Sequence, residues 1–376
     1  MTTKPSASLL ALLLALPACG DLTDVPADVL DLAYRPDGQL VVYTTGGIKV
    51  YEGDLASERV SIQINLGTNL SFDPFSLSAN GEVAGVTYQA GVEGQPPPPK
   101  VQLYRIADGS SLGSFQSALD QTQMVLSPSG DKVYAFGSLE NESLYNLADG
   151  SQLWSLRFGQ MARGSDYCKV IGSPLPAPVF TPDGATMYIP FLERLVAVDV
   201  ATGSAHEIAS VRACIGALVA LPDGSLLVHR GFPRAFNMLP SDAAQANSFA
   251  IYTTDGTLLR EIPAFAGYET ETTIWGDASQ VACAPVGDTC AMAGLPSPYP
   301  EAASGVHDRT LLVWRRDGSL LQSISLPLVN GIAFSPDGSR IAVGTNFVEE
   351  GYGSARIYSV ADGALLAERK YTKGVF

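Results

Sequence analysis

Short β-prone runs recur along most of the chain, and turn-forming residues separate them. The clearest unit covers residues 331–371. Its first run ends at Pro336-Asp337-Gly338, where proline presets φ, aspartate can accept backbone N–H bonds and glycine takes the left-handed conformation. β-prone runs joined by such turns predict strands, so the unit predicts a four-stranded antiparallel meander. Its predicted strands cover residues 332–335, 340–345, 355–360 and 365–370.

Two turns of this unit recur along the chain. The glycines of the first turn are 40 to 63 residues apart, and propeller blades recur at about 40 to 50 residues, so the longer gaps predict insertions. These glycines are Gly38, Gly81, Gly130, Gly184, Gly224, Gly287 and Gly338. The second turn recurs at Asp108-Gly109, Asp149-Gly150, Thr202-Gly203, Asp255-Gly256, Asp317-Gly318 and Asp362-Gly363, with Glu52-Gly53 as a looser first copy. The two interleaved series predict seven units.

A single four-stranded meander cannot bury both of its faces, so each unit needs a similar sheet on either side. The predicted fold is therefore all-β, a seven-bladed β-propeller of four-stranded antiparallel blades over residues 30–376. The composition agrees, with 46% hydrophobic residues, 37 glycines and 25 prolines. Because the last unit contains all four of its strands, we expect no strand exchange between the termini.

The run Phe334-Ser335-Pro336-Asp337-Gly338 resembles the first hairpin of the WD-repeat and YVTN-like β-propeller superfamily. The resemblance covers nearly all of the chain after the N-terminal segment. The Trp-Asp dipeptide of the WD repeats is missing, and Trp314-Arg315 comes nearest to it. The motifs are specific for the fold but say little about function, because propellers serve many functions.

The N-terminus has the pattern of an export signal. An apolar run at residues 9–16 is too short to span a bilayer and is typical of a secretory signal. Leu16-Pro17-Ala18-Cys19 then resembles a bacterial lipobox, which implies that Cys19 becomes the lipid-bearing first residue. We expect residues 1–18 to be a signal peptide and residues 19–29 a lipidated tether. The alternative is an ordinary signal cut after Ala18, with Cys19 incidental.

The lipoprotein resemblance also implies a location. Gly20 follows the cysteine, where an aspartate would favour retention in the inner membrane of enterobacteria. We therefore expect attachment to the outer membrane of a bacterial cell envelope through the acyl chains.

The charge balance narrows the classes of partner. The formal net charge is −15, and removal of residues 1–18 deletes only Lys4, which leaves 22 basic and 38 acidic residues and a charge of −16. Nucleic acid would be repelled by such a surface, as would anionic lipid in the absence of an acyl anchor.

Four further cysteines predict two disulfides in an exported chain. Cys283 and Cys290 align with Phe334 and Ile341, which face each other across the first hairpin of the last unit. Cys168 and Cys214 each precede the first strand of consecutive units. We predict the pairs 283 with 290 and 168 with 214. The alternatives are buried free thiols or zinc, although the neighbouring residues lack a metal-ligand spacing.

Long insertions mark the face on which a function is expected. In each unit the tight turns join strands 1 to 2 and 3 to 4, whereas the insertions join strands 2 to 3 or successive units, on the opposite face. They cover residues 90–99, 158–178, 231–248, 265–279, 295–308 and 347–354. Aromatic residues and arginine dominate binding hot spots, although such side chains also pack their own loops. The candidate contact residues are Arg163, Tyr167, Phe232, Arg234, Phe236, Tyr268, Trp275, Tyr299, His307 and Tyr352.

Catalysis has little support in the sequence. The three histidines, His206, His229 and His307, fall in an outer strand, a second strand and a loop, so they are not expected to converge. No nucleophile elbow, paired-histidine zinc motif or acidic calcium loop is present. Glu269 and Glu271 lack a second catalytic component, and an exposed acidic loop explains them. We predict no catalytic residue, metal or cofactor.

The leading hypothesis is a non-catalytic, lipid-anchored propeller that binds an envelope protein or peptide through the insertion-rich face. The second is an enzyme or small-ligand binder that uses the central channel, as implied by a resemblance to lactonases or quinoprotein-dehydrogenase-like propellers. Adhesion to polysaccharide through the same aromatic residues is the third. The first strands are mainly apolar, which favours binding over catalysis.

Overall fold

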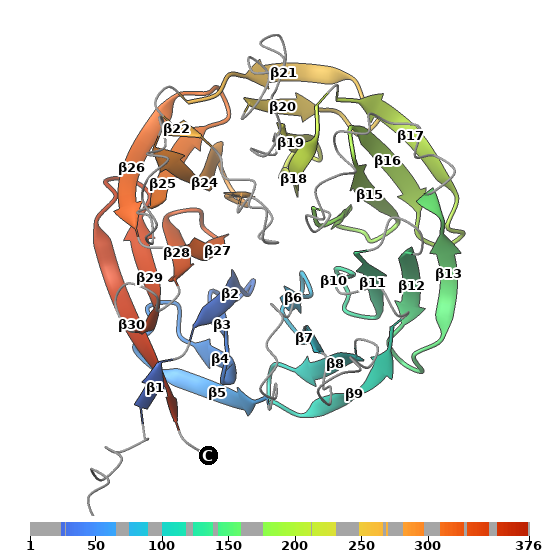
Figure 1. Ribbon diagram of the computed structural model, residues 1–376. Coiled ribbons are helices and arrows are strands. Elements are labelled where there is room, and N and C mark those ends of the chain that lie inside the picture. Colours follow the sequence, from blue (N-terminus) through green and yellow to red (C-terminus); the bar gives the residue numbers. More distant parts are fainter. Residues whose placement is uncertain are drawn as a thin grey trace, which may run out of the picture.

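Seven antiparallel sheets stand around a central axis and form a closed ring, in which the first blade lies beside the last (Figure 1). The computed structural model describes residues 24–26, 28–64, 75–88, 100–117, 123–137, 142–158, 176–211, 213–230, 248–265, 268–269, 281–296, 309–326, 329–345 and 352–374. The chain is a seven-bladed β-propeller. The predicted fold class is confirmed.

Each blade is a meander whose four strands run in chain order from the central axis to the rim. Blade 1 contains β2 (Val29–Tyr34), β3 (Leu40–Thr44), β4 (Gly47–Tyr51) and β5 (Glu58–Gln63); blade 2 contains β6 (Phe75–Leu77), β7 (Val83–Tyr88), β8 (Lys100–Arg105) and β9 (Ser111–Gln116); blade 3 contains β10 (Gln123–Leu126), β11 (Lys132–Phe136), β12 (Glu142–Asn146) and β13 (Gln152–Leu156). Blade 4 contains β14 (Val179–Phe180), β15 (Thr186–Phe191), β16 (Arg194–Asp199) and β17 (Ala205–Ser210); blade 5 contains β18 (Ile215–Ala220), β19 (Leu226–Arg230), β20 (Ser248–Tyr252) and β21 (Leu258–Ile262). Blade 6 contains β23 (Val281–Cys283), β24 (Thr289–Pro296), β25 (Arg309–Arg315) and β26 (Leu320–Leu326); blade 7 contains β27 (Val329–Phe334), β28 (Arg340–Thr345), β29 (Gly353–Ser359) and β30 (Leu365–Gly374). Two short strands join these sheets: β22 (Tyr268–Glu269) pairs with β24, and β1 (Asp24–Pro26) pairs with β30.

Left-handed residues close the turns that the sequence predicts. All seven glycines of the first turn have φ between 69° and 89°. The second turn of blade 1 differs from the prediction, because Leu55, not Gly53, has a positive φ, of 63°. The Leu55 N–H donates to the Glu52 carbonyl at 2.9 Å. A left-handed leucine is strained, but its side chain is buried between blades 7 and 1, which offsets that strain.

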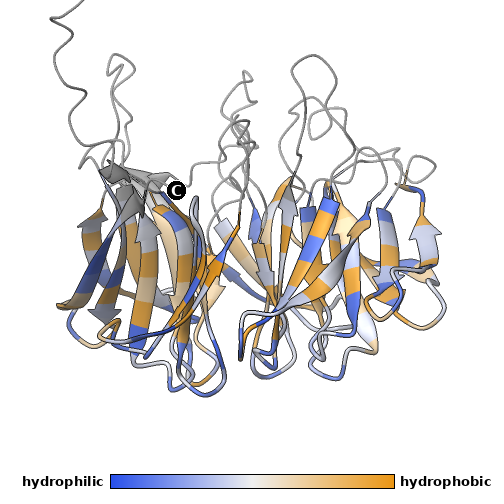
Figure 2. Cartoon of the chain, turned by 90° about the horizontal axis from the view of Figure 1, so that it is seen from below, coloured by the Kyte–Doolittle hydropathy of each residue, from blue (hydrophilic) through white to orange (hydrophobic). Residues whose placement is uncertain are grey.

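The hydrophobic core lies between the blades. Seven clusters of buried side chains each combine residues of two neighbouring blades, and together they occupy all seven junctions. Between blades 3 and 4, the rings of Phe158 and Phe191 stack with centroids 4.6 Å apart. Between blades 5 and 6, Phe249 and Trp314 lie 4.9 Å apart. Hydrophobic residues recur along the strands (Figure 2), and inner strands such as β3 and β20 are buried along their whole length, so each sheet packs side chains on both faces.

The ring closes where blade 7 meets blade 1. The rings of Tyr51 in β4 and Tyr371 in β30 lie 6.4 Å apart, and the Arg369 guanidinium lies 4.7 Å from the Tyr51 centroid. Blade 7 has four strands of its own, as expected, but β1 adds a fifth on the outer edge of β30. The expectation that the termini exchange no strand is therefore wrong in this respect. The exposed edge of β30 offers unpaired backbone groups, and the N-terminal segment pairs with them.

The innermost strands also join directly at this junction. The Asn330 amide in β27 donates to the Val29 carbonyl in β2 at 2.8 Å. A Cβ atom on Gly331 would lie 2.7 Å from the Asp31 Oδ1 atom and 3.1 Å from the Leu32 backbone nitrogen. The absence of a side chain at Gly331 therefore permits β27 to approach β2.

Gly331→Ala should lower the free energy of unfolding by about 1 to 3 kcal/mol, because the added methyl group meets backbone atoms that cannot move independently. Gly46→Ala is the matched control, since its Cβ would have Thr44 Oγ1 at 3.7 Å as its nearest neighbour. Urea unfolding followed by tryptophan fluorescence measures both variants. An equal loss of stability in the two would contradict the proposed close approach.

Candidate functional site

The two faces of the ring differ in their connections. We call the face that carries the first-to-second and third-to-fourth strand connections the turn face, and the opposite one the insertion-bearing face. Every connection on the turn face is a short turn. The insertion-bearing face receives the connections at residues 89–99, 157–178, 231–247, 263–280, 297–308 and 346–352. The long connections thus begin and end at strand ends on one face, as the repeat analysis predicts.

Hydrogen bonds on the turn face tie neighbouring blades together. Arg35 Nε donates to the Gly81 carbonyl at 3.0 Å, and Trp154 Nε1 donates to the Val200 carbonyl at 2.8 Å. Similar bonds run from Asn80 to the Ser129 carbonyl, from Gln322 to the Ala361 carbonyl and from Arg340 to the Gly53 carbonyl. These five side chains therefore help to hold neighbouring blades together.

A side-chain latch closes several first turns. In blade 7, the Ser335 hydroxyl donates to Asp337 Oδ1 at 2.5 Å and accepts the Arg340 N–H at 3.0 Å. Thr181 and Asp183 form the same pair in blade 4. These bonds to the carboxylate lower the pKa of Asp337 to about 2. The latch therefore favours an ionised aspartate.

Blade 6 replaces this latch with a disulfide. Its first turn, Ala284-Pro285-Val286-Gly287, lacks both the hydroxyl and the carboxylate. Cys283 and Cys290 face each other across the hairpin with Cα atoms 4.0 Å apart and are joined by a disulfide, which confirms that predicted pair. The covalent bond closes a turn for which the usual side chains are missing.

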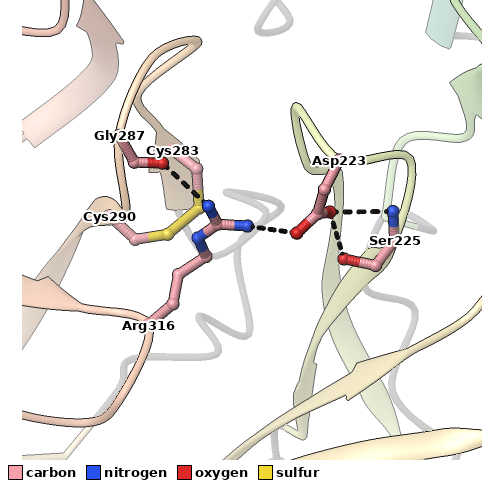
Figure 3. Close-up of a disulfide and its surroundings, with 6 residues drawn as sticks. All are labelled: Asp223, Ser225, Cys283, Gly287, Cys290 and Arg316. Atoms are coloured by element: carbon pink, nitrogen blue, oxygen red, sulfur yellow. Dashed lines mark hydrogen bonds and ion pairs between the residues drawn. A yellow bond between two sulfur atoms is a disulfide. The ribbon is translucent and has the colours of Figure 1, made fainter.

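Arg316 connects this hairpin to blade 5 (Figure 3). Its Nη2 donates to the Gly287 carbonyl at 2.8 Å, and its Nη1 lies 2.8 Å from Asp223 Oδ2. Asp223 also accepts hydrogen bonds from the N–H and hydroxyl of Ser225. The guanidinium thus fixes the disulfide hairpin against the first turn of the neighbouring blade.

Cys214 is disulfide-bonded as well. Cys168 lies outside the described residues, so the pairing of Cys168 with Cys214 stays a prediction. Cys19 also lies outside them.

Replacement of Cys283 and Cys290 by serine should lower the free energy of unfolding by about 2 to 3 kcal/mol, because the unfolded chain is no longer cross-linked. Adding Ala284→Ser and Val286→Asp to that variant rebuilds the latch of the other turns and should restore part of the loss. Thermal unfolding without reductant measures both variants. Unchanged stability in the double serine variant would show that the disulfide is not needed to close this turn.

Of the ten predicted contact residues, the structure describes Tyr352 and the backbone of Tyr268. Tyr352 is half-buried, and the Lys370 ammonium lies 4.1 Å from its ring centroid, so this ring packs on its own blade. Tyr268 lies in β22, which pairs with β24. The other eight lie outside the described residues, and their role in binding stays a prediction: Arg163, Tyr167, Phe232, Arg234, Phe236, Trp275, Tyr299 and His307.

A buried carboxyl group lies at the insertion-bearing end of blade 3 and was missed by the sequence analysis. Glu142 begins β12 and is 1% exposed. Its Oε2 accepts a hydrogen bond from the Tyr134 hydroxyl, and its buried Oε1 has no hydrogen-bond partner among the described residues. Burial raises the pKa of Glu142 to about 7, although the Tyr134 bond lowers it. The sequence feature that could have revealed its burial is its position two residues before Leu144, which places both side chains on the same side of the strand.

Two basic side chains at the end of β19 are also buried. Burial lowers the pKa of His229 to about 3, and its ring lies 5.0 Å from that of Phe249. Arg230 is 7% exposed and pairs with Glu261 at 2.8 Å. His206 lies in the outermost strand of blade 4, so His206 and His229 do not converge, as predicted.

The channel side of the ring carries a few polar side chains. The Ser76 hydroxyl accepts the Leu126 N–H from the next blade at 2.9 Å, as Asn330 binds Val29 across another junction. Asp31 in β2 is half-buried, and desolvation raises its pKa to about 7. Within the described residues no three His, Cys, Asp or Glu side chains gather as a metal site would require.

The raised pKa values of Glu142 and Asp31 predict that stability falls as pH rises. The folded state holds a proton on Glu142 up to about pH 7, whereas the unfolded chain releases it near 4.5. The free energy of unfolding therefore falls as the pH rises between these two values, by about 3 kcal/mol for Glu142. Below about pH 4 the ionised turn aspartates oppose this trend, since their lowered pKa values stabilise the fold only while they are charged.

Glu142→Gln keeps an acceptor for the Tyr134 hydroxyl and removes the titration. It should be more stable than the parent at pH 8 and nearly equal to it at pH 5. Glu193→Gln, on the turn between β15 and β16, is the control. Chemical unfolding at both pH values provides the measurement, and parallel pH profiles for Glu142→Gln and the parent would sink the assignment.

Comparison with known proteins supports the fold. No protein-family model matches the chain, and no curated protein matches its sequence. The β-propeller domain of Cps50 (Swd1) from Myceliophteria thermophila is similar in structure, with a TM-score of 0.61 and 16% identity over 87% of this chain and 95% of that one. Hydrazine synthase from Kuenenia stuttgartiensis has a TM-score of 0.56 and 14% identity over 90% of this chain and 98% of that one. At such identities the likeness concerns the fold alone.

Proposed function

We propose that this protein is a non-catalytic interaction module that binds another envelope protein or peptide through its insertion-bearing face, and that an acylated Cys19 anchors it to a bacterial outer membrane. The observation that carries the proposal is the one-sided distribution of long connections. Function concentrates on loops that a rigid scaffold holds, and this scaffold presents its long connections from a single face.

The turn face is a less suitable binding surface, because several of its polar side chains already form bonds between blades. Arg340 and Trp154 donate to carbonyl groups of neighbouring blades, and Arg316 pairs with Asp223 of blade 5 while it also donates to Gly287 of its own blade. A partner on that face would compete with bonds that hold the ring.

The rim is a weaker candidate. Exposed leucines lie near the start of the outermost strands of blades 2, 3, 5, 6 and 7: Leu112, Leu153, Leu258, Leu259, Leu320, Leu365 and Leu366. They are spread over five blades, and single exposed apolar residues are common on soluble surfaces.

A small ligand in the central channel is the second candidate, and Asp31 favours it. This half-buried carboxyl group on the innermost strand of blade 1 has a pKa near neutrality, as a proton-transfer group would require. Ser76 and Asn330, in contrast, hold neighbouring blades together. We therefore favour protein binding over a small ligand in the channel.

Native protein extracted gently from its own membrane should carry one partner protein in stoichiometric amount. Replacement of residues 231–247 or 270–280 by Gly-Ser linkers should reduce recovery of the partner at least tenfold, because these segments supply several candidate contact residues. Quantitative mass spectrometry of the purified complex measures the loss.

Asp108→Asn, in a tight turn of the turn face, is the control and should keep the partner. Folding of each variant is checked by its thermal unfolding. A bound metabolite, metal or cofactor without any protein partner would overturn the proposal and direct attention to the channel.

A further inference from the structure

The N-terminal strand leaves the ring on the insertion-bearing side. In β30 the chain runs from the Asp362-Gly363 turn on the turn face to Gly374 at the other end. Gly353, the first residue of β29, lies opposite Tyr371, so residues 372–374 continue beyond the blade. β1 pairs with this overhang, at the outer rim of blade 7 (Figure 1).

The direction of β1 then fixes where the preceding chain departs. Asp24 lies opposite Gly374 and Pro26 lies opposite Thr372. Since β1 is antiparallel to β30, its first residue is the one farthest from the turn face. The chain that precedes β1 therefore joins it at the insertion-bearing end of the blade.

The distance from Asp24 to the proposed anchor is short. Five residue steps separate Cys19 from Asp24, and a fully extended chain covers at most about 3.6 Å per residue, or about 18 Å in all. The ten residues of β30 span about 33 Å at about 3.3 Å each. The tether is thus too short to run back along the blade and bring the turn face to the membrane.

We infer that the pairing of β1 with β30 holds the insertion-bearing face toward the membrane that contains the acyl chains, and that its partner is a protein embedded in that membrane. This inference rests on the proposed acylation of Cys19. The lipid surface itself is a poor partner, because the mature chain has a net charge of −16, with 22 basic and 38 acidic residues. A membrane protein that exposes a soluble surface within reach of the tether fits both constraints.

Energy transfer to an acceptor lipid tests the orientation. Donor dyes are placed at Gly46 or Asp54, two turn residues at opposite ends of β4, through an azide-bearing amino acid that leaves the cysteines untouched. The lipidated protein is reconstituted in vesicles of zwitterionic lipid that contain a small fraction of the acceptor lipid. Transfer should be several-fold stronger from position 46 than from position 54.

A variant with 24 Gly-Ser residues inserted between Gly20 and Asp21 is the matched control. It keeps the anchor and the ring, but frees the orientation, so the two donors should transfer nearly equally. Equal transfer in the unmodified tether, or stronger transfer from position 54, would overturn the inferred orientation.

The mass of the N-terminal peptide distinguishes failure of the proposed lipid anchor from failure of the inferred orientation. A peptide that begins at Cys19 without acyl chains would overturn the anchor in the proposed function and this inference with it. An acylated peptide together with the wrong transfer pattern would overturn this inference alone. The partner should remain in membranes washed with carbonate at high pH, and its release by that wash would contradict a membrane-embedded partner.

Discussion

Every blade depends on its neighbours to bury its two faces. A four-stranded meander has apolar side chains on both sides, and here the clusters that contain them lie at the seven junctions between blades. No junction can be left open without exposing one of these clusters. The contact between blades 7 and 1 is thus as necessary as the six that follow chain order, although it joins the two ends of the domain.

That junction has several independent supports. Asn330 binds β2 at the channel, Gly331 lets the inner strands approach, and Tyr371 packs near Tyr51 farther out. The guanidinium of Arg369 lies over the Tyr51 ring. Such redundancy is expected where loop closure over nearly the whole chain costs the most conformational entropy.

Local constraints were predictable from the sequence and long-range ones were not. The left-handed position of a tight turn favours glycine, so the spacing of the turn glycines indicated seven units. The strand register across a single hairpin likewise placed Cys283 opposite Cys290. Leu55 takes the left-handed position in blade 1 because burial between blades 7 and 1, which are far apart in the sequence, compensates for its strain. The pairing of β1 with β30 joins Asp24 to Gly374 and has no local signal. Glu142 had a local signal, its place two residues before Leu144, but how deeply it is buried depends on how blade 3 packs within the ring.

The face of the candidate site followed from topology, whereas its individual contacts did not. In a meander, successive connections lie on alternate faces of the ring. The lengths of the connections in the sequence were therefore enough to separate the insertion-bearing face from the turn face. Which side chains of a long loop point outward depends on how that loop packs, and sequence spacing does not determine this. Tyr352 illustrates the difference, because it lies on the predicted face but packs against Lys370 of its own blade.

The separation of the two faces also divides stability from binding. The turn face contains the glycine turns, the aspartate latches, the disulfide and the bonds between blades, all within short connections. The hydrophobic junctions continue through the disc, and residues at the ends of the long connections, such as Phe158, take part in them. Changes in the middle of an insertion should cost little free energy of unfolding, because the closure entropy of a loop grows only slowly with its length. A ring built in this way can change its binding loops while its core and closure stay the same, which is the arrangement expected of an interaction scaffold.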